Sequence, residues 1–473
     1  MTDSPQFRKV LGLRDLVAMN VAAIVGLRWI SRSARIGAPA MVLWVLAWGL
    51  FFLPLAGAVY ELSSRYPDQG GLYAWTRRAL GPVHGFICGW CVWVNNLFYF
   101  PSLLLFIAAN VLVVFGPSAT PLADSRTFST IFVLGGLAFC LGLNLLGLGA
   151  GRWLQIVGGV SNWIPAFLLI VAGIVALATV GSATNFAPAN LLPHEDTLGT
   201  ISLWSALCFA FSGFELTSFV GGEVKNARRT IPLGVVLGGV VVTVIYIAGS
   251  AALLVALPVA ALNERSGIAD AVAMSAGRLG LGGVGAFTGA LVAVGALAGV
   301  NAWFGGSARV PFAAGVDAAL PPSFARLDAR GTPRAALVTQ FIASALIFLA
   351  SVFISVTGGR TSIQEAYDIL VNLTILIYFV PYLYLFVALV RLRRDPASAG
   401  GPDTRRLPGG QAGLWLIAGA GFLATAISLA LLFVPPAGTE NVINYEANLI
   451  GQAAIVLGVG WALYRFSARA TRR

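Results

Sequence analysis

Long apolar runs are the feature that most limits how this chain can fold. Each run reaches the length of about 20 residues that a helix needs to cross roughly 30 Å of hydrocarbon, and the runs are too long for the strands of a membrane barrel. A helix also pairs its own backbone groups, as a lipid environment requires. Only 10% of the residues are charged, against about 25% in a soluble domain, so polar material is too scarce to cover a water-facing surface. The sequence therefore predicts an all-α integral membrane protein.

The apolar runs predict twelve spans arranged in groups. We expect a first repeat at 1–198, a second, inverted repeat at 199–390, a cytoplasmic linker at 391–411, and two further spans with a tail at 412–473. The linker is rich in proline, glycine and arginine, and it separates the last two spans from a core of ten. The predicted spans lie at 15–37, 40–61, 83–115, 128–147, 153–180, 199–222, 232–257, 281–311, 335–356, 364–390, 412–434 and 446–466.

The distribution of lysine and arginine predicts the orientation of the spans. With the N-terminus placed inside, the cytoplasmic segments hold 23 of the 30 basic residues and the outer loops hold four. The other three are Arg28, Arg32 and Arg35 of the first span. Because cytoplasmic loops of membrane proteins carry an excess of basic residues, both termini are expected in the cytoplasm, at a bacterial-type inner membrane. A missed span would scramble this alternation, so the bias also supports the span count.

The net charge of +11 does not predict nucleic-acid binding, because the basic residues are dispersed among loops and form no single basic face. Cys88 and Cys91 make a C-x-x-C pair inside an apolar run, where small packing residues are expected and accessible thiolates are not. The two histidines, His84 and His194, offer little material for a metal site. We expect no cofactor, no metal and no nucleic-acid partner, and a monomer or homodimer surrounded by lipid.

The first predicted span is both interrupted and charged. Its apolar run stops at Gly26, and Arg28, Arg32 and Arg35 follow at spacings that place them on one helical face. An arginine inside a membrane costs at least about 2.5–3.5 kcal/mol on insertion scales, so it is expected to face protein, water or a counter-charge. We expect Arg28, near mid-span, to face a central cavity. Arg35, and Arg32 with it, is expected to extend to the outer membrane interface.

The sixth predicted span carries a break and a carboxylate at its middle. Ser212 and Gly213 interrupt the apolar run, and Glu215 follows inside it. A lone carboxylate at this depth needs a partner or a proton. Its candidate partners are Arg28, the amine of a substrate, and a transported proton.

Two interrupted helices, the first and the sixth of ten, are typical of a LeuT-like core of five-plus-five inverted repeats. A broken helix exposes N–H groups that suit a carboxylate and carbonyl groups that suit an ammonium. The pattern therefore predicts alternating access around a site at mid-membrane, with backbone ligands at Gly26 and Gly213.

Four stretches resemble signatures of the amino acid–polyamine–organocation permeases. They are FAFSGFELTSFVGGEVKNARRTIP (209–232), YELSSRYPDQGGLYAW (60–75), GFICGWCVWVNN (85–96) and SARVPFAAGVDAALPPSFARLDARGTP (307–333). They are similar to the sixth span, the loop between spans 2 and 3, the start of span 3, and the loop between spans 8 and 9. The resemblance implies a ten-helix core that holds its substrate between spans 1, 3, 6, 8 and 10. It also implies transport of amino acids or their amine products by exchange or proton coupling.

The resemblance further implies which residues form the site. Glu215 falls where the family has a gating or coupling acidic residue, and Phe209 falls at its aromatic gate. Asn95 and Asn96 fall near a third-span contact, although both amides fit structural hydrogen bonds between helices equally well. The expected substrate site is Val25, Gly26, Leu27, Arg28, Trp29, Asn95, Asn96, Phe209, Ser212, Gly213, Phe214, Asn301 and Trp303, and the expected coupling or gating residues are Glu215, Arg28 and Asn162.

Two positions depart from the family pattern. Many members have small residues after the glycine of span 1, whereas Leu27, Arg28 and Trp29 bring bulk and a cation here. The forked donors of arginine bind carboxylates directly, so Arg28 either favours a carboxylate-bearing substrate or neutralises Glu215. Glutamate/γ-aminobutyrate exchangers of this superfamily also carry a basic residue near this break. Asn162 stands where some proton-coupled members have a lysine, and an amide does not titrate near neutral pH.

We therefore predict a secondary active transporter, and not an enzyme, that carries amino acids or their amine derivatives by sodium-independent exchange or proton-coupled uptake. A sodium-coupled symporter of the same fold is one alternative, with hydroxyls such as that of Ser307 as ligands, although a nearby arginine would repel the ion. A carrier of polyamines or other organic amines is another. A channel needs a continuous polar pore and an enzyme needs a catalytic cluster, and the sequence indicates neither.

Overall fold

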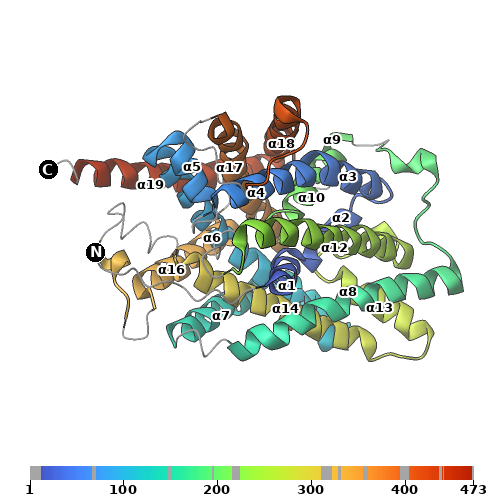
Figure 1. Ribbon diagram of the computed structural model, residues 1–473. Helices are drawn as coiled ribbons and strands as arrows, with labels where there is room; N and C mark the ends of the chain where they lie inside the picture. Colours follow the sequence, from blue (N-terminus) through green and yellow to red (C-terminus); the bar gives the residue numbers. More distant parts are fainter. Residues whose placement is uncertain are drawn as a thin grey trace.

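The protein folds as an assembly of helices, shown in Figure 1 as a computed structural model. The structure describes residues 12–66, 71–146, 152–193, 197–215, 224–309, 322–328, 332–354, 361–394, 404–435, 439 and 441–470. Within these ranges, ten helices are long and apolar enough to cross a membrane. They are the continuous segment α3–η1–α4 (Ala40–Ala47, Trp48–Phe52 and Leu53–Arg65), α6 (Pro82–Val114), α7 (Arg126–Leu145), α8 (Arg152–Val180), α12 (Ala227–Ala256), α14 (Val284–Ser307), α16 (Arg334–Phe353), α17 (Ile363–Arg394), α18 (Gly410–Leu431) and α19 (Val442–Ala470).

Two further segments consist of short helices with a break, as the sequence predicted for spans 1 and 6. Span 1 is α1 (Leu13–Ile24) followed by α2 (Leu27–Ala34). The described part of span 6 is α9 (Thr197–Ser202), α10 (Trp204–Ala210) and the non-helical residues that follow. Residues 216–222 of the predicted sixth span lie outside the described part of the chain. The predictions of an all-α membrane fold and of an interrupted first span are confirmed.

Helix boundaries follow local chemistry. Helix α6 begins at Pro82, because proline lacks the N–H that a first helical turn leaves unbonded. The preceding Gly81 adopts a φ of 91°, which glycine tolerates best. Helix α12 follows Asn226, the one described non-glycine residue with a positive φ, at 49°. Asparagine is among the few residues that enter this region without glycine's freedom, so both starts can be traced to single residues.

Two loops contain helices that the sequence analysis did not predict, α5 (Gly71–Leu80) and α13 (Gly267–Arg278). Both are too short to span a membrane, so a search for long apolar runs passes over them. Helix α13 has Asp270 in its first turn and Arg278 in its last, which complements the helix dipole. Short 3-10 turns complete the connections: η2 (Thr120–Asp124), η3 (Pro188–Leu191), η5 (Val259–Ala261) and η6 (Pro322–Ala325).

Helices α6 and α17 form the centre of the bundle. Their most apolar windows are 78% and 72% buried, whereas those of α7 and α19 are only 22% buried. Helices α7 and α19 direct many of their apolar side chains outward, as expected for helices that face lipid. Helix α12 packs against both α1 and α2 and also contacts α8, and Figure 1 shows it alongside α1 and the other segments of the core. Within span 1, all eight residues of α2 are buried.

Candidate functional site

A two-residue interruption, the span 1 break (25–26), separates α1 from α2. Val25 is extended, with ψ of 95°, and Gly26 follows with ψ of 104°. A Cβ on Gly26 would lie 2.7 Å from the indole ring of Trp29, so this position has room for glycine only. The Gly26 N–H donates to the Tyr246 hydroxyl at 3.1 Å, and that hydroxyl lies 2.7 Å from the Ile24 carbonyl. A side chain of α12 thus satisfies part of the broken backbone.

The span 6 break (211–215) begins directly after α10. Gly213 adopts a φ of 105°, a conformation that residues with a Cβ rarely adopt. Its N–H lies 3.2 Å from the Oε2 atom of Glu215 and 3.2 Å from the Tyr382 hydroxyl. The carboxylate of Glu215 therefore helps to cap the backbone of its own break.

A cavity of about 100 Å³ lies between the two breaks. Because it joins residues from both interrupted spans with residues from α6, α8, α14 and α17, it occupies the place predicted for a substrate. The expected site residues that line it are Val25, Gly26, Leu27, Arg28, Trp29, Asn95, Asn96, Asn162, Phe209, Ser212, Gly213 and Trp303.

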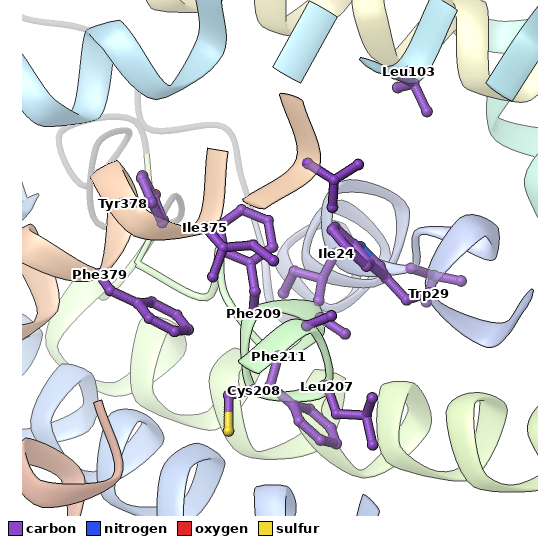
Figure 2. Close-up of a cluster of buried hydrophobic side chains, with 14 of the residues drawn as sticks. Ile24, Trp29, Leu103, Leu207, Cys208, Phe209, Phe211, Ile375, Tyr378 and Phe379 are labelled. Carbon is purple, nitrogen blue, oxygen red and sulfur yellow. The ribbon is translucent and has the colours of Figure 1, made fainter. Parts of the chain in front are cut away.

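Aromatic rings join the two interrupted spans on one side of this cavity. In Figure 2, Phe209 of α10 lies between Trp29 of α2 and the pair Tyr378 and Phe379 of α17. The ring of Phe209 is 5.3 Å from that of Trp29, 5.8 Å from that of Tyr378 and 6.1 Å from that of Phe379. Movement of α10 relative to α2 must therefore break or rebuild aromatic contacts that are worth about 0.5–1.5 kcal/mol each.

Arg28 supplies an incompletely bonded cation to the cavity. Its side chain is 2% exposed, and its guanidinium carbon lies 4.3 Å from the Trp29 ring centre and 4.9 Å from that of Tyr99. Its Nη1 donates to Ser102 at 2.9 Å, while its buried Nη2 has no hydrogen-bond partner within the described part of the chain. Arg28 forms no ion pair with any described carboxylate, Glu215 included. A buried donor and a buried charge both lack their complement here.

Glu215 is fully buried, and its carboxylate accepts several hydrogen bonds. The hydroxyls of Tyr378 and Tyr382, one turn apart on α17, both donate to Oε1. The Gly213 N–H approaches Oε2. Glu215 does not line the cavity, but Tyr378 does. The tyrosine therefore stands between the carboxylate and the space where a substrate would lie.

Three of the predicted asparagines line the cavity, two from α6 and one from α8. Asn95 and Asn96 line the cavity, and both side-chain amides donate to the carbonyl of Val92 on their own helix, at 2.6 and 2.8 Å. Asn162 lines the cavity from α8 and lies so close to Gly295 of α14 that a Cβ there would be 2.4 Å from its Oδ1.

Two predicted substrate contacts do not line the cavity. Asn301 instead accepts a hydrogen bond from Asn144 at 3.0 Å, between α14 and α7. Phe214 packs against Phe52, with ring centres 5.0 Å apart. Of the two contacts predicted for span 8, Trp303 lines the cavity and Asn301 does not.

Several cavity residues were not predicted. Tyr99, Leu103 and Phe106 follow Asn95 on α6 at steps of four, four and three residues, so they share its helical face. That spacing is visible in the sequence and would have identified them. Tyr378 had no comparable signal, because its role depends on Glu215, which is 163 residues away in the chain. The remaining unpredicted lining residues are Ile24, Ala210, Val292, Gly295, Ala296 and Gly299.

The prediction that Arg32 extends to the membrane interface is wrong, whereas Arg35 is partly exposed. Arg32 is 1% exposed, and its Nη1 lies 2.7 Å from both Glu264 and Asp368. Its Nη2 donates to Asn372, while Arg35 pairs with Glu264 at 2.7 Å. Burial alone would raise the pKa of the Glu264 carboxyl, but the two arginines outweigh it and hold that pKa below its usual range. We call these five residues the Arg32 network; they do not line the cavity.

A second buried group, the Glu61 network, lies at the C-terminal ends of α4 and α17, whereas the Arg32 network contacts the start of α17. Glu61 is fully buried and pairs with Arg65 at 3.3 Å and with Arg393 at 3.0 Å. The Leu407 N–H donates to the same carboxylate at 2.9 Å. The residues just before α18 are thereby attached to the end of α4, so part of the predicted linker is ordered against the core.

The sequence matches the profile of a family described as "Amino acid permease" over residues 11–460, which is nearly the whole chain. The chain belongs to this family. The permease is 30% identical over 462 residues to an uncharacterized transporter (lpg1691) of Legionella pneumophila, and the match covers 96% of each chain.

Two relatives of the permease have named substrates. It is 24% identical to a probable agmatine/putrescine antiporter (AguD) of Lactococcus lactis, over 90% of this chain and 87% of the relative. It is also 24% identical to a glutamate/gamma-aminobutyrate antiporter of the same species, over 84% of this chain and 78% of the relative.

The permease resembles the solved structure of MhsT in complex with L-phenylalanine, with a TM-score of 0.60 and 15% identity. The superposition covers 91% of this chain and 99% of MhsT. The predicted LeuT-like fold is confirmed. Together the comparisons make the permease a multi-pass membrane protein and a secondary transporter of small molecules.

Proposed function

We propose that the permease transports an amino acid, or a close derivative, whose carboxylate binds Arg28 between the two broken spans. One observation carries this proposal: the buried Nη2 of Arg28 has no partner among the described residues, although its cavity is large enough to hold small groups. A carboxylate supplies both the acceptor and the charge that this guanidinium lacks. Charge-assisted hydrogen bonds of this kind are among the strongest in proteins.

The charges around the cavity support an amino acid over a polyamine. No aspartate or glutamate lines the cavity among the described residues, whereas a doubly charged amine would need an anionic partner. The last carbonyls of a helix lack partners within that helix, so carbonyls at the ends of α1 and α10 can accept hydrogen bonds from one ammonium group. Of the two relatives with named substrates, the glutamate/gamma-aminobutyrate antiporter is therefore the better guide for this site.

We propose alternating access as the mechanism, with the two polar networks as the closing elements. The Arg32 network ties α2 to Asp368 of α17 and to the loop before α13. The Glu61 network ties α4 to the other end of α17 and to the start of α18. Because they lie at opposite ends of α17, their opening in turn would expose the cavity to one side and then to the other. From the bias in basic loop residues, we propose that the Arg32 network faces the outside of an inner membrane and that both termini lie in the cytoplasm.

We propose sodium-independent exchange or proton coupling, with Glu215 as the coupling group. Its carboxylate is hydrogen-bonded to Tyr378, which also lines the cavity, so substrate contact with that ring reaches Glu215 through one hydrogen bond. Sodium coupling has less support. Ser307, the hydroxyl considered for it, donates to Gln340 at 2.8 Å, and the nearby charge of Arg28 would repel a cation.

Counterflow in proteoliposomes tests this function. Vesicles with the purified permease are loaded with single amino acids or with their decarboxylated amines, and uptake of labelled substrate is measured with and without sodium. We expect saturable exchange of at least one amino acid, independent of sodium, and much weaker exchange at the same substrate concentration in Arg28→Ala. Arg394→Ala is the matched control, because that arginine also stacks on a tryptophan, Trp415 at 4.8 Å, but does not line the cavity. Exchange of amines only, retained in Arg28→Ala, would refute the proposal.

A further inference from the structure

Tyr246 of α12 contacts the backbone of both broken spans through one hydroxyl group. The oxygen accepts from the Gly26 N–H in the span 1 break at 3.1 Å and lies 2.7 Å from the carbonyl of Ile24, the last residue of α1. It also lies 3.1 Å from the carbonyl of Ala210, the last residue of α10 before the span 6 break. Tyr246 itself does not line the cavity. Its hydroxyl therefore contacts the backbone of cavity-lining residues without itself facing the cavity.

The hydroxyl has fewer protons than acceptors. A phenol carries one O–H, so it donates fully to one carbonyl at a time. Ile24 of span 1 and Ala210 of span 6 compete for it, and the distances of 2.7 and 3.1 Å favour Ile24 in this structure. If either helix end moves away, the proton becomes available to the other. The hydrogen bonding of one break thus depends on the position of the other.

Packing fixes the position of the Tyr246 ring, and therefore the position of its hydroxyl between the two breaks. The ring stacks on Trp44, with centres 4.9 Å apart and planes at 14°, and it meets Phe211 edge-on at 5.7 Å. Trp44 is fixed in turn by donating to Ser250, one turn further along α12, at 2.9 Å. Tyr246 is fully buried, so water does not replace its hydroxyl, and unmet backbone groups at the helix ends would be costly.

We propose that Tyr246 is a positioning residue that couples the two breaks, by sharing one hydroxyl proton between the span 1 and span 6 backbones. Rearrangement at one break then changes the hydrogen bonding at the other, and substrate contact with either helix end is felt by both. The proposal rests on the proposed transport through the cavity, since it concerns how the two halves of that site move together.

Hydrogen-exchange mass spectrometry of Tyr246→Phe tests the coupling directly. The variant keeps the ring and its stacking but removes the shared hydroxyl. We expect amide exchange to rise in peptides covering both breaks, 24–28 and 209–213, by roughly 3- to 10-fold, the loss that corresponds to one neutral hydrogen bond. Tyr384→Phe is the matched control, because it removes a hydroxyl bonded to His84 at 3.2 Å, away from both breaks. Faster exchange confined to 24–28, or no change in either peptide, overturns the proposal.

A transport assay separates positioning from simple stabilisation. For Tyr246→Phe we expect KM for the exchanged substrate to rise by roughly 3- to 10-fold, with a melting temperature close to wild type. A lower maximal rate with unchanged KM points to loss of folded protein and overturns the proposal. If Tyr246→Phe is not monodisperse, 3-fluorotyrosine at position 246 replaces it, since fluorine makes the phenol a stronger donor without removing it. The prediction is then slower exchange in both peptides, and a change in one peptide only is contrary to it.

These readouts are independent of the proposed function. Hydrogen exchange needs no substrate, so the coupling is tested even if counterflow fails for every amino acid tried. Conversely, normal counterflow in a Tyr246→Phe variant with unaltered exchange at both breaks rejects the coupling and leaves the proposed function intact.

Discussion

Each broken span carries one charged side chain next to its interrupted backbone. The two charges are opposite, and they differ in how many of their hydrogen bonds are made within the protein. At the span 1 break, Arg28 reaches the cavity with a buried nitrogen that no described residue satisfies. At the span 6 break, Glu215 is bonded to two tyrosines and to the Gly213 amide, and it stays behind the cavity wall. A polar group that lacks a hydrogen-bond partner can gain one from a ligand. A polar group whose partners all lie within the protein instead stabilises the structure or responds when those partners move. On this comparison we propose that span 1 recognises the substrate and that span 6 couples its binding to movement.

Removing the incomplete group gives the largest expected effect. Arg28→Ala deletes the donors proposed for the substrate carboxylate, and we expect the KM for exchange to rise by roughly 10- to 100-fold, as for loss of a charge-assisted hydrogen bond. Arg28→Lys keeps the charge but not the fork, so it is expected to restore part of this loss. Steady-state uptake by both variants measures it, with Arg394→Ala as control. An unchanged KM in Arg28→Ala would show that Arg28 of span 1 does not bind the substrate.

Neutralising the complete group tests the other half of the comparison. Glu215→Gln keeps an oxygen that accepts from Tyr378 and Tyr382, so the fold is expected to persist. We expect the maximal exchange rate to fall by roughly 10-fold, the worth of about 1.4 kcal/mol, while KM changes much less. Uptake measured between pH 5 and 8 is also expected to depend less on pH than in wild type. A rise in KM equal to that of Arg28→Ala would show that the two breaks share one role.

The backbone of the span 6 break offers a smaller and more local perturbation. Gly213→Ala places a Cβ on a residue with a φ of 105°, and we expect a loss of stability of about 1–2 kcal/mol from that strain. Thermal unfolding of the purified variant measures it. Gly451→Ala on α19 is the control, because a Cβ there meets no atom within 4 Å and the residue is helical. Equal melting temperatures for the two variants would contradict the strained conformation of the break.

The smallest expected effect concerns the far end of span 1, where the Arg32 network anchors α2. Because the arginines hold the pKa of Glu264 below its usual range, its ion pairs contribute stability above the ordinary carboxyl pKa of about 4.3, and this contribution is lost as pH falls through the lowered value. Between pH 7 and 5 we expect no change from this group. Below about pH 4 the wild type should lose a contribution that Glu264→Gln never has. Melting temperatures of the two proteins should therefore converge on acidification, and parallel curves would count against the network.

Much of this site was readable from the sequence because membrane spans make exceptions visible. Gly26, Arg28 and Glu215 stand out in apolar runs, where a break or a charge is costly. Arg32 and Arg35 are equally visible, but their partners Glu264 and Asp368 lie more than 220 residues away. No local rule brings such pairs together, so Arg32 was wrongly placed at the interface and the ion pair of Arg35 was not predicted.

Tyr246 illustrates a second limit of sequence reasoning. A tyrosine in an apolar helix reads as ordinary core, and nothing nearby indicates that its hydroxyl meets three backbone groups from two other spans. The same holds for Tyr378, whose meaning comes from Glu215. The division of the chain into repeats at 198 and 390, the orientation of the termini and the oligomeric state stay predictions.

The central claim is that Arg28 completes its bonding with a substrate carboxylate, and ligand-induced stabilisation tests it most directly. Melting temperatures of wild type and Arg28→Ala are measured with each amino acid and with the amine that lacks only its carboxylate, since a ligand that binds the folded state raises the melting temperature. The account predicts that wild type is stabilised by an amino acid but much less by its amine, and that Arg28→Ala loses this discrimination. Equal stabilisation of wild type by both members of every pair, or discrimination that survives in Arg28→Ala, would contradict it.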